Sequence, residues 1–130
     1  MLSIVGTLYN SAAYLEAFVQ RSLAAAGQVA GAVEVVLVND GSPDDSLHVA
    51  RSLADRHPEV RVIDLSRNFG HHRAMMCGLE HAAGSRVFLI DVDLEEPPEV
   101  LVEFWNRMQA EPDVDVVFGQ LSQRRGTWFE

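Results

Sequence analysis

The sequence has no lysine and only one cysteine, Cys77. Without lysine the chain cannot carry a P-loop, a Schiff-base nucleophile or the lysine of a phosphoacceptor receiver domain. A single cysteine excludes a disulfide framework and a zinc site built from a CxxC pair. No apolar run approaches the roughly 20 residues that span a bilayer, and the N-terminus lacks the basic region of a secretory signal. We therefore expect a soluble, cytosolic protein.

Basic residues are also scarce. The ten arginines stand against 19 acidic residues, which gives a formal net charge of −9. An acidic surface does not attract nucleic acid, and it repels a phosphate-bearing ligand unless a cation or local hydrogen-bond donors intervene. The 130 residues are 48% hydrophobic and 22% charged, which is typical of one globular domain able to bury a core.

The hydrophobic pattern alternates between strands and helices. Apolar runs predict strands at residues 2–8, 33–38, 60–65, 86–90 and 115–118, and helical spacing predicts helices at 12–26, 71–82 and 98–109. One more helix is expected to have Ser42 as its N-cap and Pro43 as its first residue, and to run to about Arg56. This order predicts an α/β fold with a doubly wound, mostly parallel sheet. Ligands of such sheets bind at the carboxyl ends of the strands, near the switch in strand order.

Two aspartates, Asp91 and Asp93, directly follow the fourth predicted strand. Their oxygen ligands suit Mg²⁺ or Mn²⁺, which can bridge the phosphates of a nucleotide. The alternative is that Asp91 caps a turn and Asp93 is solvated. The neighbouring acids Glu95, Glu96 and Glu99 are interpreted as the acid-rich start of a helix rather than as metal ligands.

Polar residues also follow the second and third predicted strands. Asp40 is a candidate acceptor for a nucleobase or ribose, and Gly41 would allow close backbone approach, although Asp-Gly is equally ordinary turn chemistry. Arg67 and Gly70 flank the start of a predicted helix, where an arginine and free N–H groups can hold a phosphate. The next residue, His71, is interpreted as a surface histidine.

Four segments resemble, in order, the motifs of family 2 glycosyltransferases of the GT-A fold. These segments are SIVGTLYN (residues 3–10), VVLVNDGSPDDS (35–46), LSRNFGHHRAMMCGLEHAAG (65–84) and LIDVDLEEPPEVL (89–101). The last two look like the polyprenyl-phosphate branch, which includes dolichol- and undecaprenyl-phosphate sugar transferases. The resemblance implies a Rossmann-like, three-layer α/β/α sandwich with a mostly parallel sheet, of which this chain would hold about five strands.

The resemblance also implies roles for individual residues. Asp91 and Asp93 would be catalytic: Asp91 would lie near the ribose and diphosphate of the donor, and Asp93 would bind the Mg²⁺ or Mn²⁺ that bridges the diphosphate. The other nucleotide-sugar-binding residues would be Thr7, Tyr9, Asn10, Asp40, Gly41, Arg67 and Gly70.

The implied reaction is transfer of a hexose from a UDP- or GDP-sugar to a polyprenyl phosphate, in cell-envelope glycan synthesis. The acceptor phosphate is already ionised, so the reaction would need little general-base help. The cation would act mainly by stabilising the departing nucleoside diphosphate.

Two positions depart from the family pattern, which commonly has Pro at the place of Thr7 and Gln-Asp at the place of Glu95-Glu96. The catalytic domain of the family is also longer than this chain. Residues 1–130 are therefore expected to be the N-terminal, nucleotide-sugar-binding part of an enzyme at the cytoplasmic face of a membrane, whose acceptor half and membrane segments lie elsewhere.

A non-catalytic nucleotide-sugar-binding or interaction module of the same fold is the alternative to an enzyme. An incomplete domain also leaves a sheet edge or an apolar face uncovered, so we expect homodimers that form as the concentration rises.

Overall fold

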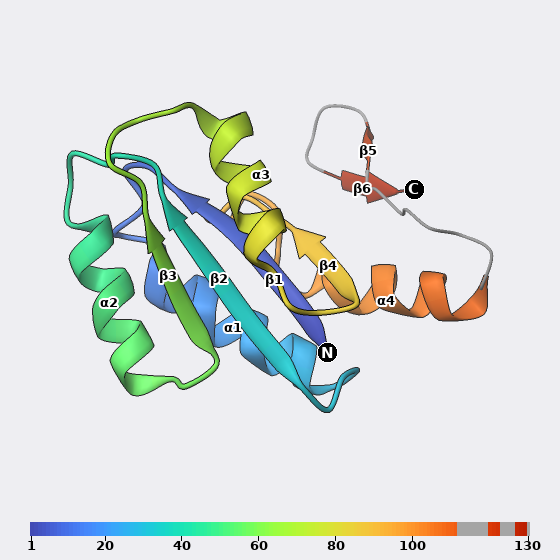
Figure 1. Cartoon of the computed structure of the whole chain (residues 1–130). Helices are drawn as coiled ribbons and strands as arrows, with labels where there is room; N and C mark the ends of the chain where they lie inside the picture. Colours follow the sequence, from blue (N-terminus) through green and yellow to red (C-terminus); the bar gives the residue numbers. More distant parts are fainter. Residues whose placement is uncertain (112–119, 123–126, 130) are drawn as a thin grey trace.

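The computed structural model describes residues 1–111, 120–122 and 127–129, and the side chains of the first of these ranges. Its main sheet has four parallel strands in the order β3-β2-β1-β4 (Figure 1). The strands are β1 (Leu2–Leu8), β2 (Val33–Asn39), β3 (Val60–Asp64) and β4 (Arg86–Leu89). The helices are α1 (Leu15–Gly27), α2 (Ser46–Arg56), α3 (His71–His81) and α4 (Val100–Ala110).

The alternating order of strands and helices that the sequence predicted is confirmed over residues 2–110. The strand predicted at 115–118 lies outside the described residues. The sequence did not predict β5 (Gln120–Ser122) and β6 (Thr127–Phe129), which form a separate antiparallel pair.

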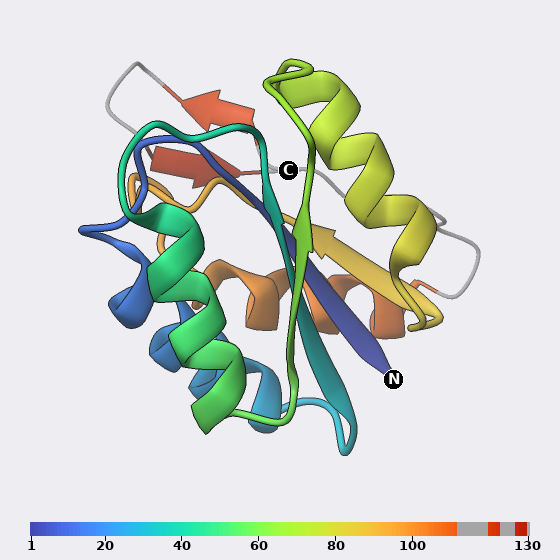
Figure 2. The same cartoon turned by 60° about the vertical axis from the view of Figure 1, so that its left-hand side comes forward.

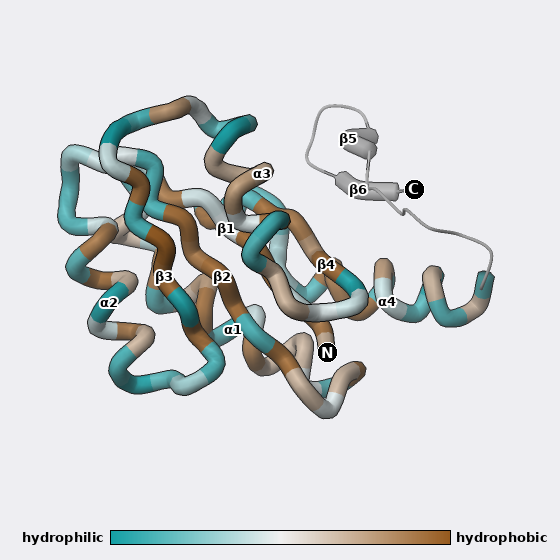
Figure 3. Tube along the Cα trace, in the orientation of Figure 1, coloured by the Kyte–Doolittle hydropathy of each residue, from teal (hydrophilic) through white to brown (hydrophobic). Residues whose placement is uncertain are grey.

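The sheet lies between two helical layers, as Figures 1 and 2 show: α3 covers one face, and α1, α2 and α4 cover the other. Successive residues of a strand point to opposite faces, so Val5, Val36 and Val38 pack with Ala74 beneath α3. Their neighbours Ile4, Leu8, Val35 and Leu37 join the larger core against α1, α2 and α4. Figure 3 shows this apolar character concentrated in the central strands. The expected three-layer sandwich is confirmed.

Close packing of α3 on the sheet depends on a glycine. A Cβ at Gly78 would lie 2.5 Å from Val5 Cγ1 and 3.0 Å from Val38 Cγ2.

The side of α3 that faces away from the sheet is less well covered, since Met76 and Leu79 are exposed, as is Leu89 of β4. The expectation of homodimers stays a prediction.

Three helices begin later than the sequence predicts, and one of them, α4, begins at Val100 rather than at residue 98. The first begins at Leu15 rather than at residue 12, because a turn closed by a bond from Tyr14 N–H to the Ser11 carbonyl comes first. The second begins at Ser46, so the prediction of Ser42 as its N-cap was wrong. Ser42 Oγ instead accepts a hydrogen bond from Asn10 N–H, 2.8 Å away, and so joins two loops.

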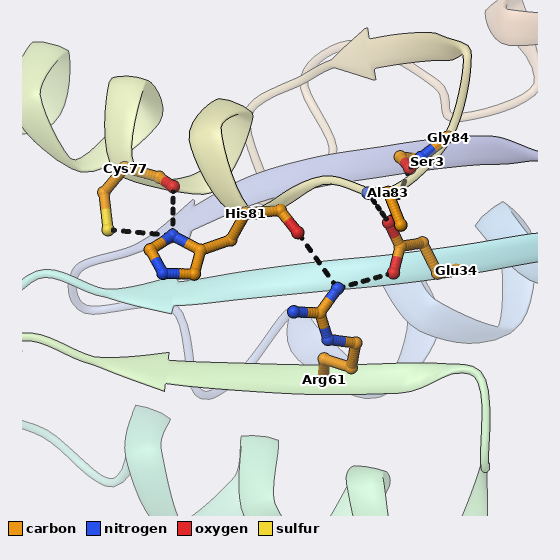
Figure 4. Close-up of polar contacts among 7 residues, drawn as sticks. All are labelled: Ser3, Glu34, Arg61, Cys77, His81, Ala83 and Gly84. Atoms are coloured by element: carbon orange, nitrogen blue, oxygen red, sulfur yellow. Dashed lines mark hydrogen bonds and ion pairs between the residues drawn. The ribbon is translucent and has the colours of Figure 1, made fainter.

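A buried carboxylate links several segments at the end of the sheet where its parallel strands begin (Figure 4). The side chain of Glu34 in β2 is 8% exposed, and it accepts hydrogen bonds from Ser3 Oγ, Ala83 N–H and Arg61 Nη1 at 2.6, 2.6 and 2.7 Å. Ser3 Oγ in turn accepts a bond from Gly84 N–H at 2.8 Å. Glu34 therefore anchors the segment between α3 and β4 to the sheet, and so helps to set where β4 begins.

Candidate functional site

The strand order places the topological switch point between β1 and β4. The chain moves outward from β1 to β2 and β3, and then returns to the other side of β1 to form β4. Thr7 lies near the carboxyl end of β1, and Asp91 follows β4. Because ligands of open parallel sheets bind at such a switch point, these two predicted residues lie where a ligand is expected.

A histidine joins the two residues at the switch point. His71, the first residue of α3, has Nδ1 3.0 Å from Thr7 Oγ1 and Nε2 3.4 Å from Asp91 Oδ1. The side chains of His71 and Asp91 are 56% and 51% exposed, so this group faces solvent. This exposure confirms the interpretation of His71 as a surface histidine, which however did not include its contacts with Thr7 and Asp91. Its place immediately after the helix start at Gly70 is the signal that could have assigned it to the carboxyl edge of the sheet.

The loop between β3 and α3 packs on the end of β2. Asp40 is 3% exposed, and its Oδ1 accepts a hydrogen bond from Phe69 N–H at 2.8 Å. The Asn68 side-chain amide donates to the Asp40 carbonyl at 3.0 Å. Gly41 has a φ of +64°, and a Cβ there would lie 2.4 Å from Asn68 N. The close approach that Gly41 permits in the structure is thus to this loop, whereas the sequence interpretation placed a ligand there.

Arg67 and Gly70 shape the start of α3. The guanidinium of the exposed Arg67 lies over the Phe69 ring, with its Cζ 4.4 Å from the ring centroid. Gly70 precedes the helix with a φ of +101°, a conformation that glycine adopts without strain, and its carbonyl accepts the Ala74 N–H. An oriented cation beside a helix N-terminus is an arrangement suited to a phosphate.

The loop between β1 and α1 is held by side chains of the loop after β2. The three consecutive amide groups of residues 10–12 donate hydrogen bonds to Ser42 Oγ, Ser46 Oγ and Asp44 Oδ2, at 2.8, 2.8 and 3.2 Å. This loop carries the predicted nucleoside-pocket residues Tyr9, which is 51% exposed, and Asn10, whose φ is +55°. The loop that carries these two residues is therefore held by a segment more than thirty residues further along the chain.

Asp44 is the centre of that contact. The sequence predicts it to be an acid in the first turn of a helix, but that helix begins only at Ser46. Desolvation alone would raise the pKa of Asp44, but bonds from the Ser42 and Ser46 hydroxyls and from the Ser46 and Ala12 N–H groups lower it to about 2. The carboxylate is thus ionised at neutral pH and serves as the shared acceptor of both loops. The alternation of Ser42, Asp44 and Ser46 directly after Gly41 is the sequence signal for this role.

Acidic residues crowd the segment after β4. The turn there is capped by Asp93, whose Oδ1 accepts the Glu95 N–H at 3.1 Å. The alternative to a metal site, in which Asp91 caps the turn, is therefore wrong in the residue that it names. Burial, together with the negative charges of Asp91, Asp93 and Glu95, raises the pKa of Glu96. Glu99 is paired elsewhere: Arg21 of α1 donates to both of its oxygens, at 2.9 and 2.7 Å.

The donor set at this segment suits a hard cation only in part. Asp91 and Asp93 offer oxygen ligands in a negative local field, as Mg²⁺ and Mn²⁺ require. Within residues 1–111 and the two short strands beyond, no three His, Cys, Asp or Glu side chains converge as a metal site. A cation bound here would therefore complete its coordination with water or ligand phosphates, which is the usual state of Mg²⁺.

The sequence is similar to those of known glycosyltransferases. The family model described as "Glycosyl transferase family 2" matches residues 3–130. A Mycobacterium tuberculosis protein named "Putative glycosyltransferases" is 53% identical over 127 residues, which are 98% of this chain and 37% of that protein. The undecaprenyl-phosphate 4-deoxy-4-formamido-L-arabinose transferase of Sodalis glossinidius is 38% identical over 132 residues, 98% of this chain and 39% of that protein.

A solved structure supports the fold. The crystal structure of Staphylococcus aureus TarS residues 1–349 in complex with UDP-GlcNAc is 25% identical in sequence and superposes with a TM-score of 0.67. The match covers 85% of this chain and 32% of that one. The chain thus spans less than half the length of the relatives it matches. Among the helices of its described part, none has the length and apolar character needed to cross a bilayer.

Proposed function

The chain belongs to glycosyl transferase family 2, and we propose that it is the nucleotide-sugar-binding part of an enzyme that glycosylates a polyprenyl phosphate. The observation that carries this proposal is the meeting of Thr7, His71 and Asp91 at the switch point between β1 and β4. Beside it, the loop with Arg67 packs on Asp40. Apart from His71, these are residues expected to bind a nucleoside diphosphate sugar, and they come from four separate strand ends.

The chain offers a different group to each part of the donor. Tyr9 presents an exposed ring to the base, on a loop that Ser42 and Asp44 fix in place. Arg67, oriented by the Phe69 ring, contacts the diphosphate together with the first N–H groups of α3. These donors offset the repulsion that a chain of net charge −9 exerts on an anionic ligand.

Asp93 would hold the divalent cation, with Asp91 contributing to the negative field around it. When bound, the cation neutralises charge on the nucleoside diphosphate as it departs. Burial and the negative charges of Asp91, Asp93 and Glu95 raise the pKa of Glu96 beside them, which indicates a negative local field where the cation would bind.

The acceptor is proposed from the relatives that bear the name undecaprenyl-phosphate transferase. A phosphate monoester is ionised at neutral pH, so this chain's residues need only bind and orient the acceptor, without removing a proton from it. The acceptor-binding half is expected in a further part of the protein, at the cytoplasmic surface of a membrane.

Calorimetric titration with UDP- and GDP-sugars in the presence of Mn²⁺ tests the donor site. We expect one class of donor to bind, and Asp93→Ala to weaken its binding at least about tenfold, the scale on which metal-site substitutions act. Glu111→Ala, which removes an exposed acid beyond the end of α4, is the matched control and should bind like the wild type. If a folded wild-type protein binds neither donor, the proposal is wrong.

Transfer itself is tested with the full-length protein, undecaprenyl phosphate and a radiolabelled donor. Label in the lipid fraction is the expected result. Donor binding without transfer to any lipid phosphate would instead favour a non-catalytic nucleotide-sugar-binding module of the same fold.

A further inference from the structure

We propose that Asp40 makes this chain select uracil over guanine as the base of its nucleotide ligand. The inference rests on the proposed donor site and names the base of the donor. It follows from how many hydrogen bonds Asp40 can still accept in the folded chain. Asp40 is 3% exposed and lies beside the residue that precedes Tyr9, because the Asp40 N–H donates to the Leu8 carbonyl at 3.0 Å.

The loop between β3 and α3 already uses the carbonyl oxygen and one carboxylate oxygen of Asp40. Phe69 N–H donates to Oδ1 at 2.8 Å, and the Asn68 side-chain amide donates to the carbonyl at 3.0 Å. Within residues 1–111, Oδ2 has no hydrogen-bond partner. Oδ2 still reaches solvent, because Ser22 Oγ is the one fully buried side-chain oxygen or nitrogen of these residues that lacks a partner. Asp40 therefore offers a ligand one acceptor atom, Oδ2.

A single acceptor atom matches the hydrogen-bonding edge of uracil. A carboxylate has only acceptor positions, so it pairs with N–H groups of the base. Uracil has one such group, N3–H, between two carbonyl oxygens, whereas guanine has two adjacent donors, N1–H and its 2-amino group. Two free carboxylate oxygens would accept both guanine donors. With Oδ1 bound to Phe69, Asp40 accepts only one of them, and the other stays without a partner, which weakens binding.

The same count disfavours the ribose as the partner of Asp40. The 2′ and 3′ hydroxyls of a ribose are adjacent donors, which also suit a carboxylate with two free oxygens. A flat base fits the position better, because Tyr9, directly after β1, presents a ring that is 51% exposed. In this arrangement Tyr9 contacts the face of the base, and Asp40 contacts its edge.

The substitution Asp40→Asn should change which base is preferred, and not only how tightly the nucleotide binds. Phe69 N–H fixes the orientation of the new amide, because only the amide oxygen can accept that bond. The NH₂ group then takes the place of Oδ2 and donates to the ligand. Cytosine has an unprotonated N3 where uracil has N3–H, so the variant should favour cytosine. A residue with a purely structural role would not reverse this preference.

Calorimetric titration of the full-length protein with UDP, GDP and CDP, each with Mn²⁺, tests the inference. We expect the wild type to bind UDP at least about tenfold more tightly than GDP or CDP, the scale on which one unpaired hydrogen-bonding group acts. In Asp40→Asn, the ratio of the CDP dissociation constant to the UDP dissociation constant should fall at least about tenfold. The wild-type comparison needs no variant, so it decides the inference even if Asp40→Asn does not fold.

The matched control is Asp55→Asn, which makes the same chemical change at an exposed position of α2 and should keep the wild-type order of affinities. Wild-type protein that binds GDP as tightly as UDP would overturn the inference and leave the donor site intact. Equal weakening of UDP and CDP in a folded Asp40→Asn variant would overturn it as well, since Asp40 would then contact the ribose or act only on the fold. If the wild type binds none of the three nucleotides, the proposed function is wrong, and the inference fails with it.

Discussion

Replacing the buried Glu34 should destabilise the protein by an amount that depends on how many of its hydrogen-bond donors lose their acceptor. The carboxylate accepts bonds from Ser3, Ala83 and Arg61, and its side chain is 8% exposed. In Glu34→Gln, the amide oxygen can still serve Ser3 and Ala83, but the NH₂ group then faces the Arg61 guanidinium, which has no acceptor to offer.

The sizes follow from these partners. Arg61 is 44% exposed and can turn to water, so Glu34→Gln should cost about 1–2 kcal/mol, the range for one mismatched buried hydrogen bond. Glu34→Ala leaves the Ser3 hydroxyl and the Ala83 N–H without this acceptor as well, and should cost about 3 kcal/mol. Urea denaturation followed by circular dichroism at pH 7 measures both values.

The control is Glu80→Gln, an exposed acid on α3, which should change the free energy of unfolding by less than about 0.5 kcal/mol. A Glu34→Gln variant as stable as this control would refute the reasoning, and so would a Glu34→Ala variant no less stable than Glu34→Gln.

The pH dependence gives a second check on Glu34. Burial alone would raise the pKa of Glu34, but the bonds from Ser3, Ala83 and Arg61 lower it below its ordinary value. A lowered pKa stabilises the folded state above the unfolded pKa of about 4.3, and this contribution is lost as the pH falls through the folded value. The stability gap between wild type and Glu34→Ala should therefore be constant from pH 7 to pH 5 and shrink below about pH 4. A gap unchanged at pH 3 would contradict the charge argument.

Two other substitutions test packing and loop anchoring. Gly78→Ala should lower the free energy of unfolding by about 1–3 kcal/mol, because its Cβ would overlap Val5. The control Gly27→Ala has open space around it and should be neutral or stabilising. Equal effects of the two substitutions in urea denaturation would contradict the close packing of α3. Asp44→Ala should cost about 1 kcal/mol, the value of a lost helix cap, and should speed hydrogen exchange at the Ser46 amide. Because the pKa of Asp44 is lowered to about 2, the loss should persist at pH 4 and disappear only as the pH falls towards 2; a loss already absent at pH 4 would argue against the ionised acceptor.

The sheet could be predicted from the sequence because its signal is local. Residues 33–39 form an almost unbroken β-branched and apolar run, which is typical of a strand covered on both faces. The strand-end positions of Asp40 and Asp91 followed from the same pattern. The helix starts were less predictable, since Ser42 has the residue type of an N-cap but is used by Asn10, 32 positions away.

Long-range partners account for what the sequence left out. His71 looks like any exposed histidine until the fold brings Thr7 and Asp91 to its two nitrogens. Glu34 stands within an apolar strand with no sign of Arg61 or Ala83, which reach it from β3 and from the segment before β4. Contacts of this kind depend on strand order, which a single sequence does not specify.

The bonds from the amides of residues 10–12 to side chains of residues 42–46 have a consequence for protein engineering. A chimaera that takes the loop around Tyr9 from a relative keeps its backbone amides satisfied only if that relative's Ser-x-Asp-x-Ser segment, or an equivalent, is transplanted with it. Attempts to alter the base preference that we propose for this loop should therefore exchange both segments together, although they are far apart in the sequence. If only one segment is exchanged, the loop around Tyr9 loses these hydrogen bonds, and we expect it to become disordered rather than to change its base preference.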